Sequence, residues 1–128
     1  MTVSRSAVEQ YLYEVKAAIR NNRYIIARNS KRQDNLDLFS DYIIDEADAK
    51  AVLLSLEADD FSEVRQNTHI GQEHEILWIF GKNVNLIGRF SGVEKVIGLY
   101  IKFNKLENKY VIVVSFHEQK HPLTYYFK

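Results

Sequence analysis

Two runs of alternating apolar and polar residues near the C-terminus constrain the fold more than any other segment of this chain. They cover residues 98–103 and 110–118 and flank a turn centred on Glu107-Asn108. Because successive side chains of a strand point to opposite faces, this period predicts a β-hairpin with one apolar face. The side chains expected on that face are Leu99, Ile101, Phe103, Ile112, Val114 and Phe116.

The opposite face of the hairpin is predicted to gather polar side chains. An even-length turn pairs Lys102 with Val113 and Tyr100 with Ser115, and it leaves His117 on the same side. This face then carries a phenol, an ammonium, a hydroxyl and an imidazole, which are groups that can bind a phosphodiester and move protons at it. A one-residue bulge would reverse part of this arrangement.

The rest of the sequence predicts helices first and strands afterwards. Apolar spacing predicts a helix over about 5–21, capped by Ser4 or Ser6, and a second helix over 45–56, capped by Asp45. A short helix or turn is expected near 36–43, an extended segment at 24–27 and an exposed loop at 65–75. The predicted strands are 76–80, 84–90, 96–103, 110–116 and 123–127. The fold class is therefore α+β, with two or three N-terminal helices packed on a C-terminal antiparallel sheet.

Composition is consistent with one domain over residues 1–128. The apolar fraction of 46% supports a core, and the absence of cysteine excludes disulfides and thiolate metal sites. No apolar run is long enough for a membrane span, so we expect a cytoplasmic protein that does not contact membranes. The net charge is zero, which argues against a general nucleic-acid binder. However, an acidic block at 35–63 separates two basic segments, and those segments could converge in the fold.

Several short motifs occur in an informative order. They are Trp78-Ile79-Phe80-Gly81-Lys82, Tyr100-Ile101-Lys102, Ser115-Phe116-His117-Glu118 and Pro122-Leu123. In this order they resemble the MqsR-like toxins of bacterial toxin–antitoxin pairs, which belong to the RelE-like group of small messenger-RNA-cleaving ribonucleases. The resemblance extends over nearly the whole chain.

The resemblance implies a RelE-like fold and metal-independent endoribonuclease activity without a cofactor. It implies messenger RNA as the substrate, free or on the ribosome, and neutralisation by a separately encoded antitoxin protein. The site tyrosine of the family corresponds to Tyr100, and a site lysine corresponds to His117. Two positions depart from the family pattern: a lysine is replaced by Glu63 and a glutamine by Ile79.

The candidate catalytic residues are His117, Tyr100 and Lys102. Imidazole changes charge near neutral pH, so His117 is the expected general base or acid. Lys102 could neutralise a phosphate oxygen, and Tyr100 could donate a hydrogen bond to phosphate or stack on a base. The further candidates for binding RNA are Lys82, Arg89 and Ser115.

Other interpretations fit the same residues. The departures at Glu63 and Ile79 favour a non-catalytic RNA- or protein-binding module of the same fold, a decayed toxin. An unrelated small α+β enzyme with a pocket around His117 is a third hypothesis. No metal site is predicted, because His117 and His121 have helical ligand spacing but lie at the end of a strand.

Overall fold

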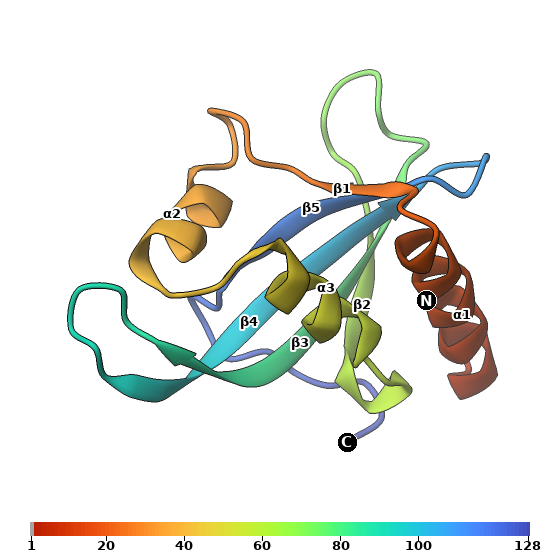
Figure 1. The fold of residues 1–128 in the computed structure, drawn as a ribbon. Helices are drawn as coiled ribbons and strands as arrows, with labels where there is room; N and C mark the ends of the chain where they lie inside the picture. Colours follow the sequence, from red (N-terminus) through yellow and green to blue (C-terminus); the bar gives the residue numbers. More distant parts are fainter. Residues whose placement is uncertain (1) are drawn as a thin grey trace.

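The computed structural model describes residues 2–128, in which three N-terminal helices precede most of a five-stranded sheet (Figure 1). A single turn of 3₁₀ helix follows the third helix. The elements are α1 (Arg5–Arg20), β1 (Tyr24–Ile26), α2 (Gln33–Asp41), α3 (Glu46–Leu54), the 3₁₀ turn Ala58–Asp60, β2 (Phe61–Gln66), β3 (Ile76–Ile87), β4 (Glu94–Lys105) and β5 (Val111–Glu118).

The two helices expected from apolar spacing are confirmed, and their ends have the predicted chemistry. The Ser4 hydroxyl accepts a hydrogen bond from the Ala7 amide at the start of α1. Asp45 and Asp48 form a reciprocal capping box at the start of α3. These caps satisfy amide groups that have no partner within the helix, so each helix begins where the sequence indicates.

The sheet is mixed, which corrects the prediction of a purely antiparallel arrangement. Its strand order is β1-β5-β4-β3-β2, and β1 pairs with β5 in the parallel direction. A crossover through α2, α3 and the following strands makes this parallel pairing possible. The four C-terminal strands pair antiparallel, as predicted. The fold class is therefore α+β with a mostly antiparallel sheet.

Three predictions about the strands were wrong. Residues 65–66, expected in an exposed loop, belong to β2, a strand that the sequence pattern did not predict. The two strands expected at 76–80 and 84–90 are one strand, because β3 runs through Gly81 without interruption. The strand expected at 123–127 is absent: this tail has only turn geometry, and the Tyr126 amide donates to the Phe61 carbonyl.

The C-terminal tail lies directly on the sheet because two strand glycines leave room for it. A β-carbon on Gly81 would lie 2.7 Å from the Leu123 side chain, and one on Gly98 would lie 3.2 Å from that of Gln119. Gln119 also bonds to β4 through its backbone and its amide side chain. The tail therefore covers one part of the sheet face opposite α1 and α3, as Figure 1 shows behind the strands.

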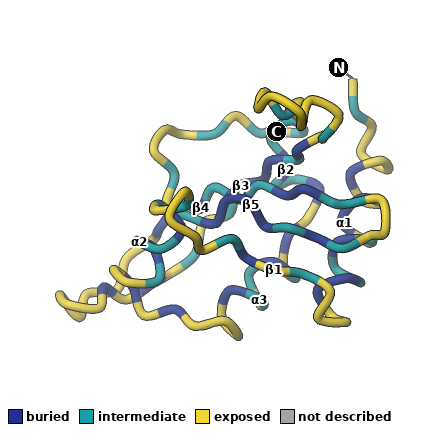
Figure 2. The backbone as a smooth tube through the Cα atoms, turned by 90° about the horizontal axis from the view of Figure 1, so that it is seen from above, coloured by how far each residue is buried: buried dark blue, intermediate teal, exposed yellow. Residues whose placement is uncertain are grey.

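The hydrophobic core lies between the sheet and the helices. Figure 2 shows buried residues running along the strands and exposed residues in the loops. The residues that β4 and β5 contribute to this core are Ile97, Leu99, Ile101, Phe103, Val111, Val113 and Phe116. We call this side the helix-covered face and the opposite side, which carries the tail, the open face.

A bulge in β5 corrects the predicted faces of the hairpin. Lys102 lies opposite Ser115, but Phe103 lies opposite Val113, so Val114 has no partner on β4. The extra residue shifts the alternation, so that Val111 and Val113 enter the core in place of the predicted Ile112 and Val114. The predicted pairs Lys102–Val113 and Tyr100–Ser115 were wrong by two residues. The even turn was wrong by one, since Lys105 lies opposite Val111, and the bulge adds the second.

Asn35 of α2 continues the hydrogen bonding of β5 where β1 ends. Its side chain is 1% exposed and donates to the carbonyls of Ala27 and Val114. Its carbonyl oxygen accepts from the Phe116 amide. One amide side chain thus replaces a neighbouring strand and satisfies buried backbone groups.

Within residues 2–128, no helix combines the length and the apolar character that crossing a membrane requires.

Candidate functional site

The open face brings Tyr100, Lys102 and His117 together, as the hairpin pattern predicts. Tyr100 lies opposite His117 in the β4–β5 ladder. Their rings are stacked, with centroids 5.2 Å apart and an interplanar angle of 13°. The Lys102 ammonium lies 5.9 Å from the centre of the Tyr100 ring. A phenol, an ammonium and an imidazole therefore form one row across two adjacent strands.

The backbone fixes the tautomer of His117. Its Nδ1 lies 2.9 Å from the Glu118 carbonyl oxygen, which can only accept, so Nδ1 carries the proton and donates it. In the neutral ring, Nε2 then has a free lone pair, as a general base requires. His117 also borders a hollow of about 270 Å³ that contains Asp34. The Asp34 carboxylate has a lowered pKa, mainly through its bond to Lys120.

Burial changes the proton chemistry of the other two groups. It raises the pKa of Tyr100, so the phenol stays protonated and acts as a hydrogen-bond donor. Burial lowers the pKa of Lys102, and the positive charges of Arg32 and Arg65 lower it further. The surroundings of Lys102 thus destabilise its charged form, and an anion bound beside it would stabilise that form.

The other three predicted RNA-binding residues have different positions. Ser115 is on the open face, opposite Lys102, but it is only 4% exposed. Lys82 lies on the helix-covered face, where its ammonium is 3.2 Å from Asp60. Arg89 donates to the carbonyls of Phe39, Ser40 and Tyr42 at the C-terminal end of α2. The structure therefore does not bring Lys82 or Arg89 to the row formed by Tyr100, Lys102 and His117.

The two positions that differ from the MqsR-like motif pattern, Glu63 and Ile79, lie close to that row. Ile79 pairs with Lys102 on one side and with Glu63 on the other, and it is fully buried. Glu63 forms an ion pair with Arg65, the next residue of β2 on the open face. Arg65 therefore supplies a cation on this face although Glu63 does not.

Sequence reasoning missed Arg32 and Arg65 as neighbours of Lys102. Arg65 lies two residues after Glu63, so the two side chains share a face if this segment is a strand. The position of Arg65 could be predicted only by recognising β2 as a strand. Arg32 immediately precedes α2 and has no sequence pattern that connects it with β4. Their joint effect on the Lys102 pKa shows that the fold brings all three cations together.

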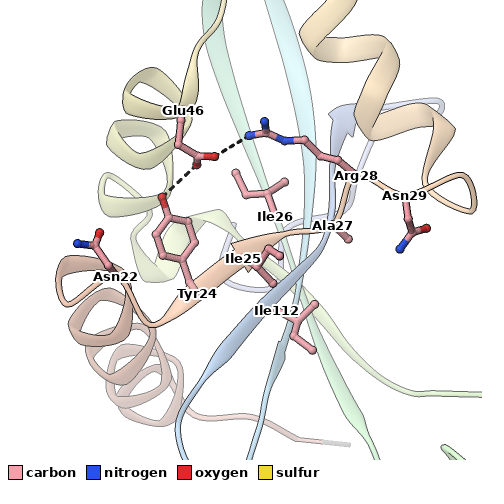
Figure 3. A pocket seen from close by; sticks show the side chains of 9 residues that line it. All are labelled: Asn22, Tyr24, Ile25, Ile26, Ala27, Arg28, Asn29, Glu46 and Ile112. Atoms are coloured by element: carbon pink, nitrogen blue, oxygen red, sulfur yellow. Dashed lines mark hydrogen bonds and ion pairs between the residues drawn. The ribbon is translucent and has the colours of Figure 1, made fainter.

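A second hollow, of about 790 Å³, follows the outer edge of β1 (Figure 3). Its polar side chains bond to one another: Glu46 accepts from the Tyr24 hydroxyl and from Arg28. Burial, with a further contribution from Glu46, raises the pKa of Tyr24 to about 12. These side chains join β1 to the first turn of α3, and their hydrogen bonds to one another leave few polar atoms for a ligand. The open face is therefore the better candidate site.

In the described part of the chain, no three His, Asp or Glu side chains are arranged to hold a metal ion. No protein-family model, curated protein or solved structure matches this chain.

Proposed function

We propose that this protein is an endoribonuclease of the RelE-like type that cleaves messenger RNA with side chains alone. The observation that carries the proposal is the row of Tyr100, Lys102 and His117 on the open face. These three groups supply a proton acceptor, a phenolic donor and a cation at neighbouring positions of one face. The resemblance to MqsR-like toxins supports the same conclusion and adds neutralisation by a cognate antitoxin.

In the proposed reaction, Nε2 of neutral His117 accepts the proton of a ribose 2′-hydroxyl. The 2′-oxygen then forms a bond to phosphorus, and the bond from phosphorus to the 5′-oxygen breaks. Lys102 and the Tyr100 hydroxyl stabilise the negative charge that develops on the phosphate oxygens. Lys102 can also give a proton to the departing 5′-oxygen, because its lowered pKa makes the ammonium a stronger acid.

A non-catalytic binding module of the same fold is the second candidate. The observation that favours it is the local replacement of family groups, since buried Ile79 and ion-paired Glu63 contribute no free cation or amide. In that case the open face would bind RNA or a protein partner without cleaving it.

Growth arrest on expression separates the two candidates. We expect wild-type protein to stop bacterial growth and degrade messenger RNA, and His117→Ala to restore growth, because loss of general acid–base catalysis costs about 10²–10⁴ in rate. His121→Ala is the matched control, since His121 is exposed in the tail. Melting temperatures of all three proteins must agree. Wild-type protein that is folded, abundant and harmless would favour the binding module.

A further inference from the structure

A polar groove lies on the open face beside the row of candidate catalytic residues. Its volume is about 550 Å³, within the range of small-ligand sites. Lys102 is common to the groove and the row, so the two are continuous. The groove is bounded by residues 27–32, before α2, and by the loop that joins β2 to β3.

The groove has an excess of positive charge. Lys31, Arg32, Arg65 and Lys102 line it, whereas Glu75 is its only carboxylate among the described residues. Arg65 pairs with Glu63, but no carboxylate within residues 2–128 forms an ion pair with Arg32 or Lys102. In a chain of zero net charge, unpaired cations gathered in one hollow indicate an anionic ligand.

The floor and walls of the groove suit a planar base. Leu77, Ile112 and Val114 provide an apolar floor, and the β5 bulge directs Val114 there instead of into the core. Glu75 accepts hydrogen bonds from the amides of Asn67 and Asn104 and holds them in place.

The Gln72 side chain also lines the groove and has no hydrogen-bond partner in the described residues. Amide groups of this kind can bond to the edges of a base.

The environment of His117 differs on its two sides. The hollow on the far side is lined by Asp34, Asp37, Asp41 and Glu118, with Lys120 as its only cation among the described residues. A phosphate chain would be repelled there and attracted over Lys102. A strand of nucleic acid at His117 would therefore continue into the groove.

We propose that this groove binds the unpaired nucleotide adjacent to the cleaved phosphate. Arg32 and Arg65 bind its phosphate, the apolar floor contacts its base, and Gln72 and Asn104 bond to the base edge. The proposal rests on the function proposed above for its location next to the cleaved bond. A base in this hollow is unstacked and unpaired, so single-stranded RNA binds and a duplex does not.

Fluorescence anisotropy with labelled RNA octamers of each base tests the groove in the full-length His117→Ala protein, which should not cleave them. We expect Arg32→Ala in this background to weaken all four octamers about tenfold and to reduce the salt slope by about 0.7. Gln72→Ala should change the order of preference among the bases and leave the salt slope unchanged. Arg20→Ala removes a charge at the end of α1 and should have less than a twofold effect.

The outcomes separate this proposal from the proposed function. If the folded Arg32→Ala and Gln72→Ala proteins bind every octamer as the parent does, or if the parent binds none, the groove proposal is overturned even when wild-type protein cleaves RNA. Equal affinity for a duplex would also overturn it. If binding follows the expected pattern while wild-type protein cleaves nothing, the groove proposal stands and the catalytic proposal fails. Arg32→Gln, which retains most of the side-chain volume, repeats the test if Arg32→Ala melts early.

Discussion

On the helix-covered face, β4 buries Leu99, Ile101 and Phe103 completely, whereas on the open face it presents Tyr100, Lys102 and Asn104. Alternate residues of one strand thus enter an apolar core and a polar surface. The core side chains are held by packing and have no titratable group. On the open face, Lys102 is partly buried among other cations, an arrangement that does not favour its charge. Stability and the proposed chemistry therefore depend on different faces of the same strand.

Neighbouring substitutions on β4 should show the largest contrast between the faces. Ile101→Ala should lower the free energy of unfolding by about 2–5 kcal/mol, because it opens a cavity in a close-packed core. Lys102→Ala should leave this free energy within about 0.5 kcal/mol of wild type or raise it, because it removes a disfavoured cation. Urea unfolding measures both. A loss above 2 kcal/mol for Lys102→Ala would mean that the open face is also structural.

The second prediction concerns Asn35, whose side chain bonds to β5 where the neighbouring strand β1 ends. Asn35→Ala removes the partner of the Phe116 amide and one donor each from the carbonyls of Val114 and Ala27. We expect a loss of about 2–3 kcal/mol in the free energy of unfolding, since buried polar groups lose their hydrogen bonds. Asn85→Ala, at an exposed position of β3, is the control for amide removal. Equal stability of the two variants would show that water replaces Asn35.

The smallest expected effect concerns the ion pairs between α1 and the end of the β4–β5 hairpin. Glu14 contacts the ammonium groups of Lys105 and Lys109 at 2.7 and 2.8 Å, and these bonds lower its pKa from 4.5 to about 2. A carboxylate with a lowered folded pKa stabilises the protein above the unfolded value. This contribution is lost as the pH falls from 4.5 towards 2.

Glu14→Gln should therefore reduce stability by about 1 kcal/mol near neutral pH and by less in acid. Thermal melts of both proteins across this pH range test the sign. A difference that grows on acidification would contradict the assigned cause.

Local patterns predicted the helices and the hairpin, and they also placed Tyr100, Lys102 and His117 on one face. These features depend on interactions close in sequence: the caps at Ser4 and Asp45, and the two-residue period of the strands. The register of the hairpin was not predictable in the same way. It combines a turn shifted by one residue with a bulge at Val114, whose carbonyl accepts from Asn35 of the distant α2.

Contacts between distant segments account for the other differences. The parallel pairing of β1 with β5 joins residues more than eighty positions apart and has no local signal. The tail resembles a strand in sequence but packs across two glycines, and an interior glycine in a strand can mark such a close approach. For the site, a sequence pattern cannot show that Arg32 and Arg65 meet Lys102, because three separate elements bring them together.

Cleavage by side chains alone is tested by incubating purified wild-type protein with single-stranded RNA in the presence of EDTA and analysing the ends of the products. Attack by a 2′-oxygen assisted by His117 predicts fragments with 2′,3′-cyclic phosphate ends and 5′-hydroxyl ends. It also predicts no cleavage at a 2′-deoxynucleotide placed at the cut site, and a loss of about 10²–10⁴ in rate for His117→Ala. Intact RNA after incubation with folded wild-type protein, both without ribosomes and in a separate reaction with ribosomes, would contradict the account, as would equal rates for wild type and folded His117→Ala.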